Sequence, residues 1–173
     1  MPGTRAERKS SLLAVLTQVG LGIALGLAAS QPERSVATER IVTDWHTGLA
    51  LYGFDPVAYF TDAAAGVGKP DLEYTYGGAV WRFRNPGNRA AFIDHPDVYT
   101  PMFGGYDPIA LARAVPTPGH PQLWLIVGQR LFLFHDTESR AAFAADPAQS
   151  IADAQAQWSM VSKGFDFRPT QGN

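Results

Sequence analysis

A stretch of twenty residues occurs twice in this chain, and this repetition constrains the fold more than any other feature. Residues 77–96 (GGAVWRFRNPGNRAAFIDHP) return without a gap as residues 128–147 (GQRLFLFHDTESRAAFAADP), 51 positions later. A shorter match lies upstream, where Gly53–Ala58 (GFDPVA) returns 52 positions later as Gly105–Ala110 (GYDPIA). Similarity at a fixed period predicts a duplicated structural unit.

Each copy, in repeat units 53–104 and 105–158, has the pattern of a helix, a β-hairpin and a second helix. Asp followed by Pro opens the first helix, because Asp accepts a hydrogen bond from a free backbone N–H and Pro has none to satisfy. A glycine-containing pair between apolar runs predicts a two-residue hairpin turn. A capping residue then starts the second helix, and a proline ends it. These roles fall to Asp55 and Asp107, Gly77-Gly78 and Gly128-Gln129, Asn85 and Asp136, and Pro96 and Pro147.

The second hairpin is more apolar than the first. Its strands, at 122–127 and 130–134, are apolar at almost every position, which predicts burial on both faces and a central place in the domain. Phe92 and Phe143 occupy the same position in the two copies, so we expect each to fill the same slot in its own half. The predicted fold is α+β: tandem duplicated helix–β-hairpin–helix units sharing an antiparallel sheet, with an N-terminal hydrophobic helix.

The N-terminus has the pattern of an export signal or a membrane anchor. Three basic residues precede an apolar run at 12–29. Ala28 and Ser30 fit a signal-peptidase site, but the run is longer than the usual signal core and reaches membrane-spanning length, which favours an anchor. Both alternatives stay open, and both place the domain on the periplasmic side of the cytoplasmic membrane.

Composition sets the remaining boundaries. We expect a signal peptide or anchor at 1–30, a polar linker at 31–47, the duplicated domain at 48–163 and a flexible tail at 164–173. The chain is 46% hydrophobic and 12% aromatic, which is enough for a packed core. Its net charge of −2 argues against a nucleic-acid partner, which would require a basic face. The sequence has no cysteine, so disulfides, thiolate catalysis and cysteine metal sites are excluded.

Two glycine-containing segments are candidate contact surfaces. Gly22 and Gly26 have a Gly-x-x-x-Gly spacing that lets another helix approach closely, although such glycines also occur in signal sequences without a partner role. In the domain, an apolar pair precedes two glycines that permit close backbone approach. There we expect a partner to contact Met102, Phe103, Gly104 and Gly105.

Four histidines, His46, His95, His120 and His135, are the candidate metal ligands, and none has the spacing of a helical metal site. His95 and Met102 together suggest a soft site for copper. The alternative is that His95 is a turn residue and Met102 fills a gap in the core. His120 and His135 are expected at polar surface positions.

Catalytic motifs are absent from the sequence. It has no Gly-x-Ser-x-Gly elbow, no His-Glu-x-x-His and no phosphate-binding loop. The carboxylates of Asp55, Asp107 and Asp136 are better explained as helix caps than as acid–base pairs. We therefore predict that the protein is not an enzyme.

Several motifs in order resemble the bacterial YHS domain family. They lie at Gly53–Phe60, Tyr76–Phe83, Asn88–Phe92 and Pro96–Tyr106, within a similarity that covers Leu51 to Trp158. The resemblance implies a small α+β domain, often exported, in a family suspected of metal binding. Members commonly have a cysteine after Gly-Gly-Tyr, where this chain has Asp107. A thiolate ligand therefore cannot be transferred by this resemblance.

The leading functional hypothesis is a non-catalytic exported binding or accessory module, tethered to the membrane and associated with an envelope protein complex. The first alternative is a periplasmic protein that handles copper through His95 and Met102. The second is an enzyme of unknown reaction that acts in a pocket between the two halves.

Overall fold

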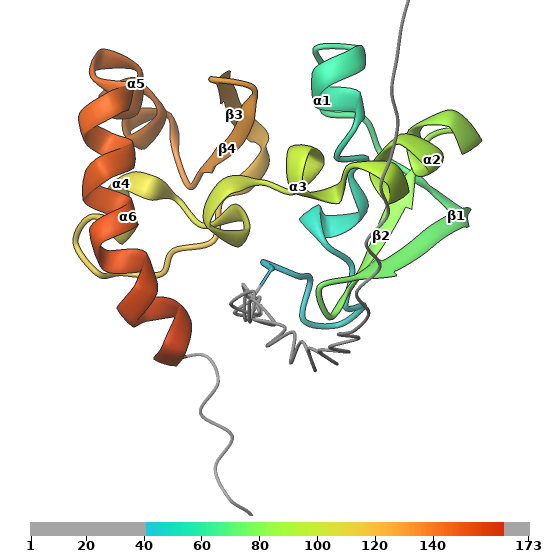
Figure 1. Cartoon of the computed structure of the whole chain (residues 1–173), viewed down its shortest axis with the longest axis horizontal. Helices are drawn as coiled ribbons and strands as arrows, with labels where there is room; N and C mark the ends of the chain where they lie inside the picture. The colour runs from blue at the N-terminus through green and yellow to red at the C-terminus, as the bar shows by residue number, and fades with distance from the viewer. Residues whose placement is uncertain (1–40, 165–173) are drawn as a thin grey trace, which may run out of the picture. The chain divides into compact units, whose positions relative to one another are not determined.

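The computed structural model describes residues 41–164, all of which belong to a unit that begins at Ser35 (Figure 1). The two repeats have the same order of elements. The first contains η1 (Leu51–Gly53), α1 (Ala58–Thr61), β1 (Lys69–Tyr76), β2 (Ala79–Phe83), α2 (Pro86–Asp94) and α3 (Pro96–Tyr99). The second contains η2 (Met102–Gly105), α4 (Pro108–Leu111), β3 (His120–Val127), β4 (Arg130–Phe134), α5 (Thr137–Ala145) and α6 (Pro147–Gly164). The predicted duplication is confirmed at the level of secondary structure.

The hairpins turn as the sequence predicts. Tyr76 pairs with Ala79, and the two residues between them, Gly77 and Gly78, have φ of 60° and 78°. In the second hairpin Gly128 and Gln129 have φ of 57° and 60°. Positive φ at both central residues is the geometry whose twist matches antiparallel strands.

The predicted shared sheet is wrong, because the two hairpins form separate two-stranded antiparallel sheets. The free edge of β2 is occupied by the chain that leads into the first repeat. The Ala50 N–H donates to the Val80 carbonyl at 2.8 Å, and the Val80 N–H donates to the Gly48 carbonyl at 3.2 Å. With that edge satisfied, the two hairpins meet through side chains instead.

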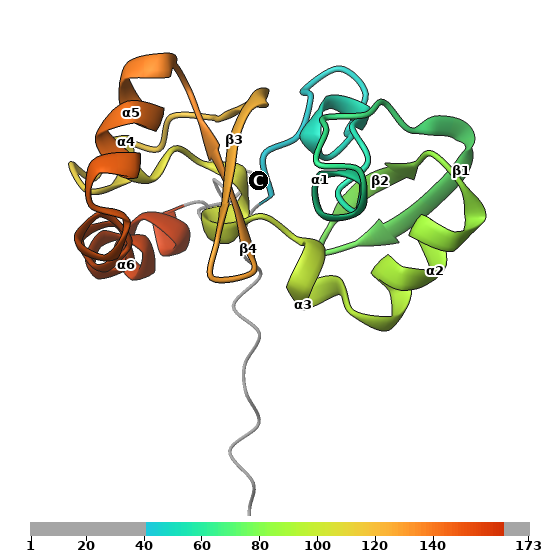
Figure 2. The ribbon, with the colours of Figure 1, turned by 90° about the horizontal axis from the view of Figure 1, so that it is seen from above.

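The second hairpin lies between α4–α6 and the elements of the first repeat (Figure 2). Its strand β4 is buried between two hydrophobic clusters, as predicted, whereas most of β3 is only half-buried. Leu131 and Leu133 of β4 pack into the cluster of the first repeat, whereas Phe132 and Phe134 pack into that of the second. Alternate residues of one strand thus face two cores. All four side chains are at most 1% exposed.

Phe92 and Phe143 fill equivalent slots, which confirms that prediction. The ring of Phe92 lies 4.9 Å from that of Trp81 and 5.3 Å from that of Phe83, between ring centroids. The ring of Phe143 lies 4.9 Å from Phe132 and 5.1 Å from Phe134, which stand at the same positions of the second hairpin.

Residues near both ends of the predicted domain take part in the described structure. Val42, placed in the linker by the sequence, is 4% exposed and donates its N–H to the Gly104 carbonyl at 2.7 Å. Packing therefore begins before residue 48, because an apolar side chain seven residues ahead of Leu49 reaches the second repeat. Helix α6 continues to Gly164. The predicted N-terminal hydrophobic helix and the tail beyond Gly164 lie outside the described residues.

Candidate functional site: a groove between the repeats

Two adjoining hollows form a groove where the first repeat meets the second. One has a volume of about 290 Å³ and is lined by Tyr52, Phe54, His120, Pro121 and Gln122. The other has a volume of about 280 Å³ and is lined by Tyr52, Pro118, Gly119, His120 and His135. Tyr52 and His120 belong to both, so they form the ridge between them. We call these eight residues the inter-repeat groove.

The wall contributed by the second repeat is built by an irregularity in the hairpin. His120 pairs with Phe134, but the next pairing joins Trp124 to Leu133, so β3 has extra residues at this point. The first hairpin has the same irregularity between Lys69 and Glu73. A bulge of this kind redirects the side chains of the longer strand. It places Pro121 and Gln122 along the groove.

Gly119 lets this wall approach β4 closely. A Cβ atom there would lie 2.5 Å from Cβ of Leu133 and 2.8 Å from the Gly105 carbonyl oxygen. The Gly119 N–H donates to that same carbonyl at 2.9 Å. In the first repeat, Gly68 donates to Gly53 at 2.8 Å. The start of the groove wall is therefore a packed, hydrogen-bonded part of the repeat.

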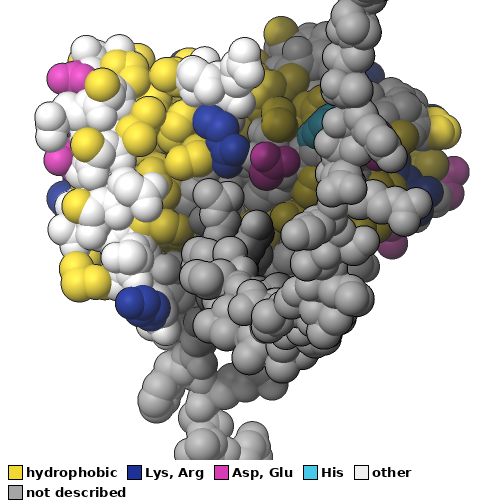
Figure 3. Space-filling model, in the orientation of Figure 1, with side chains coloured by type: hydrophobic (Ala, Val, Ile, Leu, Met, Phe, Trp, Pro, Cys, Tyr) yellow, Lys and Arg dark blue, Asp and Glu magenta, His cyan; other side chains and the backbone are white. Residues whose placement is uncertain are grey.

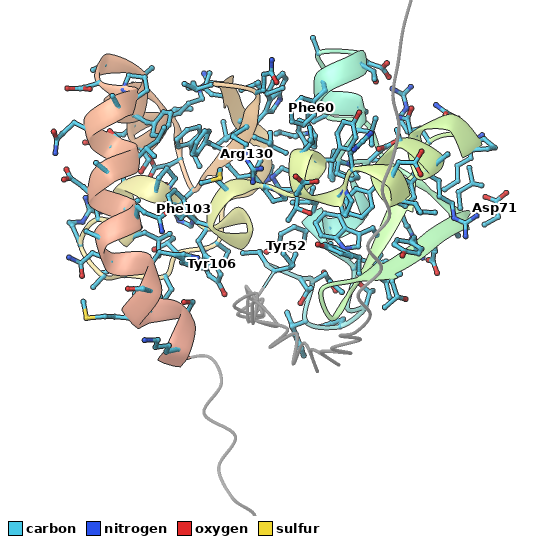
Figure 4. All side chains as sticks on the ribbon, in the orientation of Figure 1. Tyr52, Phe60, Asp71, Phe103, Tyr106 and Arg130 are labelled. Carbon is cyan, nitrogen blue, oxygen red and sulfur yellow. The ribbon has the colours of Figure 1, made fainter. Side chains whose placement is uncertain are left out.

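Tyr52 is the exposed aromatic side chain of the groove and has an unusual backbone conformation. Its φ is 54° and its ψ 27°, a left-handed conformation in which a residue with a Cβ is strained. Gly104 occupies the matching place in the second repeat with φ of 62°. The tyrosine side chain is 44% exposed and lies between the two repeats (Figure 4). Strain maintained at an exposed aromatic residue favours a functional role over a packing role.

A buried tyrosine fixes the floor behind Pro121. The Tyr59 hydroxyl, in α1, donates to the Pro121 carbonyl at 2.9 Å, and its ring meets Trp124 edge-on at 5.3 Å between centroids. Burial raises the pKa of Tyr59 far above its usual value, and the nearby Asp55 carboxylate adds to the rise. The phenol stays protonated and holds the two repeats together at this point.

The backbone contacts of the two groove histidines favour opposite tautomers. Nδ1 of His120 accepts the Gln122 N–H at 3.2 Å, so in the neutral ring the proton is on Nε2. Nδ1 of His135 lies 3.2 Å from the Pro118 carbonyl, which only accepts, so there the proton is on Nδ1 and Nε2 has a lone pair. His120 pairs with Phe134 across the hairpin, and His135 is the residue directly after Phe134.

The buried carboxylates have structural roles, as the sequence predicts. Asp55 accepts from the backbone N–H of Val57 at 2.9 Å, from that of Arg84 at 2.7 Å and from Nδ2 of Asn88 at 2.7 Å. It thus joins the start of α1 to the end of β2. Asp107 accepts from Ile109 and Ala110 at the start of α4, at 2.8 and 3.3 Å, and from the His135 N–H at 2.8 Å.

Asp107 also supports the groove. Its second carboxylate oxygen binds the backbone N–H of a groove histidine, His135. Asp107 is fully buried, and this hydrogen bond holds the backbone from which the His135 side chain extends.

The structure does not join His95 and Met102 into one site. His95 is exposed at the junction of α2 and α3, where its backbone N–H donates to Ala91 at 3.0 Å. Met102 is partly buried against the core of the second repeat. Within residues 41–164, no three His, Asp or Glu side chains are grouped so that they could hold a metal ion.

The predicted contact surface at 101–105 is mostly internal. Phe103 is 2% exposed and packs against Trp158 at 5.9 Å between ring centroids. Gly104 and Gly105 are buried, and both have positive φ. The glycines serve the turn and the hydrogen bonds from Val42 and Gly119, so close approach occurs inside the domain. Gly22 and Gly26 lie outside the described residues.

Sequence reasoning placed His120 and His135 on the surface but missed that both line one hollow. The usable signal was their position at the two ends of one predicted hairpin, at the start of the first strand and just after the second. Residues at the open end of a hairpin are neighbours across the strands.

Other exposed apolar side chains lie outside the groove. They are Trp45 at 87% exposure, Val67 and Met160 at 64%, Val115 at 51% and Ile93 at 40%. Figure 3 shows hydrophobic side chains gathered over the second repeat, beside a basic and an acidic side chain near the border with the first. Arg130, labelled in Figure 4, donates to the Asp97 carbonyl oxygen and so links β4 to α3.

Comparison with protein-family models, with curated proteins and with solved structures finds no match to this chain. In the part of the chain that the structure describes, no helix has both the length and the apolar character needed to cross a membrane.

Proposed function

We propose that this protein is a non-catalytic binding module that attaches to a partner protein through the inter-repeat groove. The observation on which the proposal rests is Tyr52, an exposed aromatic residue kept in a left-handed conformation where the second repeat has Gly104. The neighbouring Leu51 shares this conformation with φ of 52° but is buried in the core, whereas the side chain of Tyr52 is exposed. Glycine would relieve the strain at Tyr52, so an exposed aromatic side chain there favours a role in binding.

The dimensions of the groove support a partner segment over a small enclosed ligand. Each hollow is slightly below the range of about 300 to 1,000 Å³ typical of small-molecule pockets. The lining combines aromatic, proline and imidazole side chains, a composition suited to contact with another protein. Asp55 and Asp107 have their oxygens occupied by amide donors and lie away from solvent.

The proposal also includes a cellular location and a domain family. The basic and apolar N-terminal pattern favours export with a tether to the cytoplasmic membrane, which would present the groove on the periplasmic side. The motifs that resemble the YHS family support an accessory domain of that type, associated with an envelope complex.

Size analysis of the full chain, extracted from native membranes in mild detergent, tests the proposal. We expect the wild-type protein in a complex larger than the free chain, and Tyr52→Gly released from it. The glycine variant should remain folded, because φ of 54° suits glycine, and urea unfolding checks this. Met160→Ala, at an exposed apolar position outside the groove, is the control and should stay in the complex. Free wild-type protein, or a complex that tolerates Tyr52→Gly, contradicts the proposal.

A further inference from the structure

The inter-repeat groove has specific hydrogen-bonding groups, and they identify the chemistry of its occupant. His120 presents an Nε2–H donor and His135 an Nε2 acceptor, because backbone groups occupy both Nδ1 atoms. Both rings line the same hollow. One donor beside one acceptor is the complement of a peptide group, which has one C=O and one N–H.

We infer that the groove binds an extended peptide segment of the partner, with His120 donating to a carbonyl and His135 accepting an N–H of that segment. This inference rests on the proposed function and names the ligand class of the same site. The two hollows, on either side of the ridge formed by Tyr52 and His120, would each receive a side chain. Side chains on one face of an extended chain are about 7 Å apart, which suits adjoining hollows.

The backbone of the groove wall cannot bind such a segment by adding a strand. Pro118 and Pro121 have no N–H to donate. The carbonyl of Pro118 is taken by His135, and that of Pro121 by Tyr59. The Gly119 N–H is already bonded to Gly105. Recognition therefore depends on the imidazoles rather than on backbone pairing.

The same tautomers disfavour a metal ion. A metal needs a lone pair from each imidazole, yet Nε2 of His120 carries a proton while Nδ1 accepts from Gln122. Metal binding would require His120 to give up that hydrogen bond. No third carboxylate or histidine joins the pair among the described residues.

The first measurement is the tautomeric state of each ring. Long-range proton–nitrogen NMR of the full chain labelled with ¹⁵N-histidine, at neutral pH, should show the proton on Nε2 of His120 and on Nδ1 of His135. His120→Phe and His135→Phe assign the signals. The same tautomer in both rings overturns the inference. So does stoichiometric Cu²⁺ or Zn²⁺ binding that shifts Nε2 of both histidines, because the site would then be a metal site.

The second measurement uses decapeptides selected from a random library on the full chain. Tyr52→Gly should abolish binding, and His120→Phe or His135→Phe should weaken it about tenfold, the effect of one lost hydrogen bond. His46→Phe, outside the groove, should have no effect. Replacing one peptide amide by an ester removes its N–H, which should weaken binding to the wild type but cost nothing further in His135→Phe.

These results separate the two ideas. A complex in membranes that depends on Tyr52, together with peptides that ignore both histidines or the ester, refutes the inference and leaves the proposed function standing. Failure to select any peptide that depends on Tyr52 refutes the inference as well. Free wild-type protein in membranes refutes the proposed accessory function, whatever the peptides show.

Discussion

At the open end of its hairpin the first repeat has Lys69 and Arg84, where the second has His120 and His135. Both pairs flank the same irregular pairing, so the backbone that positions them is common to the two repeats. In the first repeat Arg84 forms an ion pair with Asp62 at 2.5 Å. In the second, His135 contacts a backbone carbonyl and faces a hollow. The two repeats thus differ in the side chains at this end of a shared backbone, and in the second repeat both of these side chains line a hollow.

The two hairpins also differ in what they bury. Strand β2 alternates between buried and half-buried residues, whereas four of the five residues of β4 are buried. Because β4 faces both clusters, the second repeat is the support on which the first packs. Tyr59 strengthens this asymmetry, since the matching residue of the second repeat, Leu111, has no hydroxyl to bond across the interface.

Truncation of the equivalent phenylalanines should have the largest effect and tests whether the two cores are coupled. Phe92→Ala and Phe143→Ala should each lower the free energy of unfolding by about 3–5 kcal/mol, because each leaves a cavity among aromatic rings. Since β4 belongs to both cores, each variant should unfold in one transition by circular dichroism and by fluorescence in urea. Ile93→Ala, next to Phe92 but 40% exposed, should cost much less. Separate transitions for the two halves would show that they fold independently.

The buried aspartates provide a finer comparison. Asp55→Ala should lower the free energy of unfolding by about 1 kcal/mol more than Asp107→Ala does. The reason is that Asp55→Ala leaves the buried side-chain amide of Asn88 without its hydrogen-bond partner. A double-mutant cycle in urea isolates the difference. Asp55 with Asn88 should show a coupling of about 1–2 kcal/mol. The equivalent cycle of Asp107 with Ser139 should show almost none, since the Ser139 hydroxyl interacts with Asp136. Equal couplings would remove this distinction between the repeats.

The repeat made most of the element order predictable. Two aligned copies gave a turn, cap and strand signal at the same positions twice, so each assignment in one copy was supported by the other. The failure at the sheet has a specific cause. Residues 48–50, which occupy the edge of β2, lie outside the repeated motif, and nothing in their composition indicates pairing.

The site was harder to predict than the fold. A pair of glycines such as Gly104 and Gly105 has the same sequence pattern in a turn inside the domain as on a contact surface. Only their burial in the structure distinguishes the two. Tyr52 gave no sign of its left-handed conformation, because β-turn patterns do not select tyrosine there. The histidine tautomers depend on a carbonyl and an N–H contributed by neighbouring residues in the bulge, and these contacts depend on register rather than on residue type.

Removal of the helix caps should have the smallest effect on stability. The effect should depend on pH in the second repeat but not in the first. Asn85 caps α2 by accepting from Asn88 N–H at 2.8 Å, and Asp136 caps α5 by accepting from Ser139 N–H at 2.8 Å. Asn85→Ala should cost about 1 kcal/mol at every pH, since the amide does not titrate. Hydrogen bonding from the Ser139 N–H lowers the pKa of Asp136 below its usual value.

A carboxyl whose pKa is lower in the folded state contributes stability above its unfolded pKa and loses it as pH falls through the folded pKa. The free energy of unfolding of the wild type should therefore exceed that of Asp136→Ala by a constant amount above about pH 5. This excess should shrink below the usual aspartate pKa of about 3.9. Urea unfolding at a series of pH values measures both variants. The caps would not act through these oxygens if the stability loss in Asn85→Ala shrank at low pH. The same conclusion would follow if the stability loss in Asp136→Ala stayed constant down to pH 2. Helices α2 and α5 would then share their backbone geometry but not a stabilising cap.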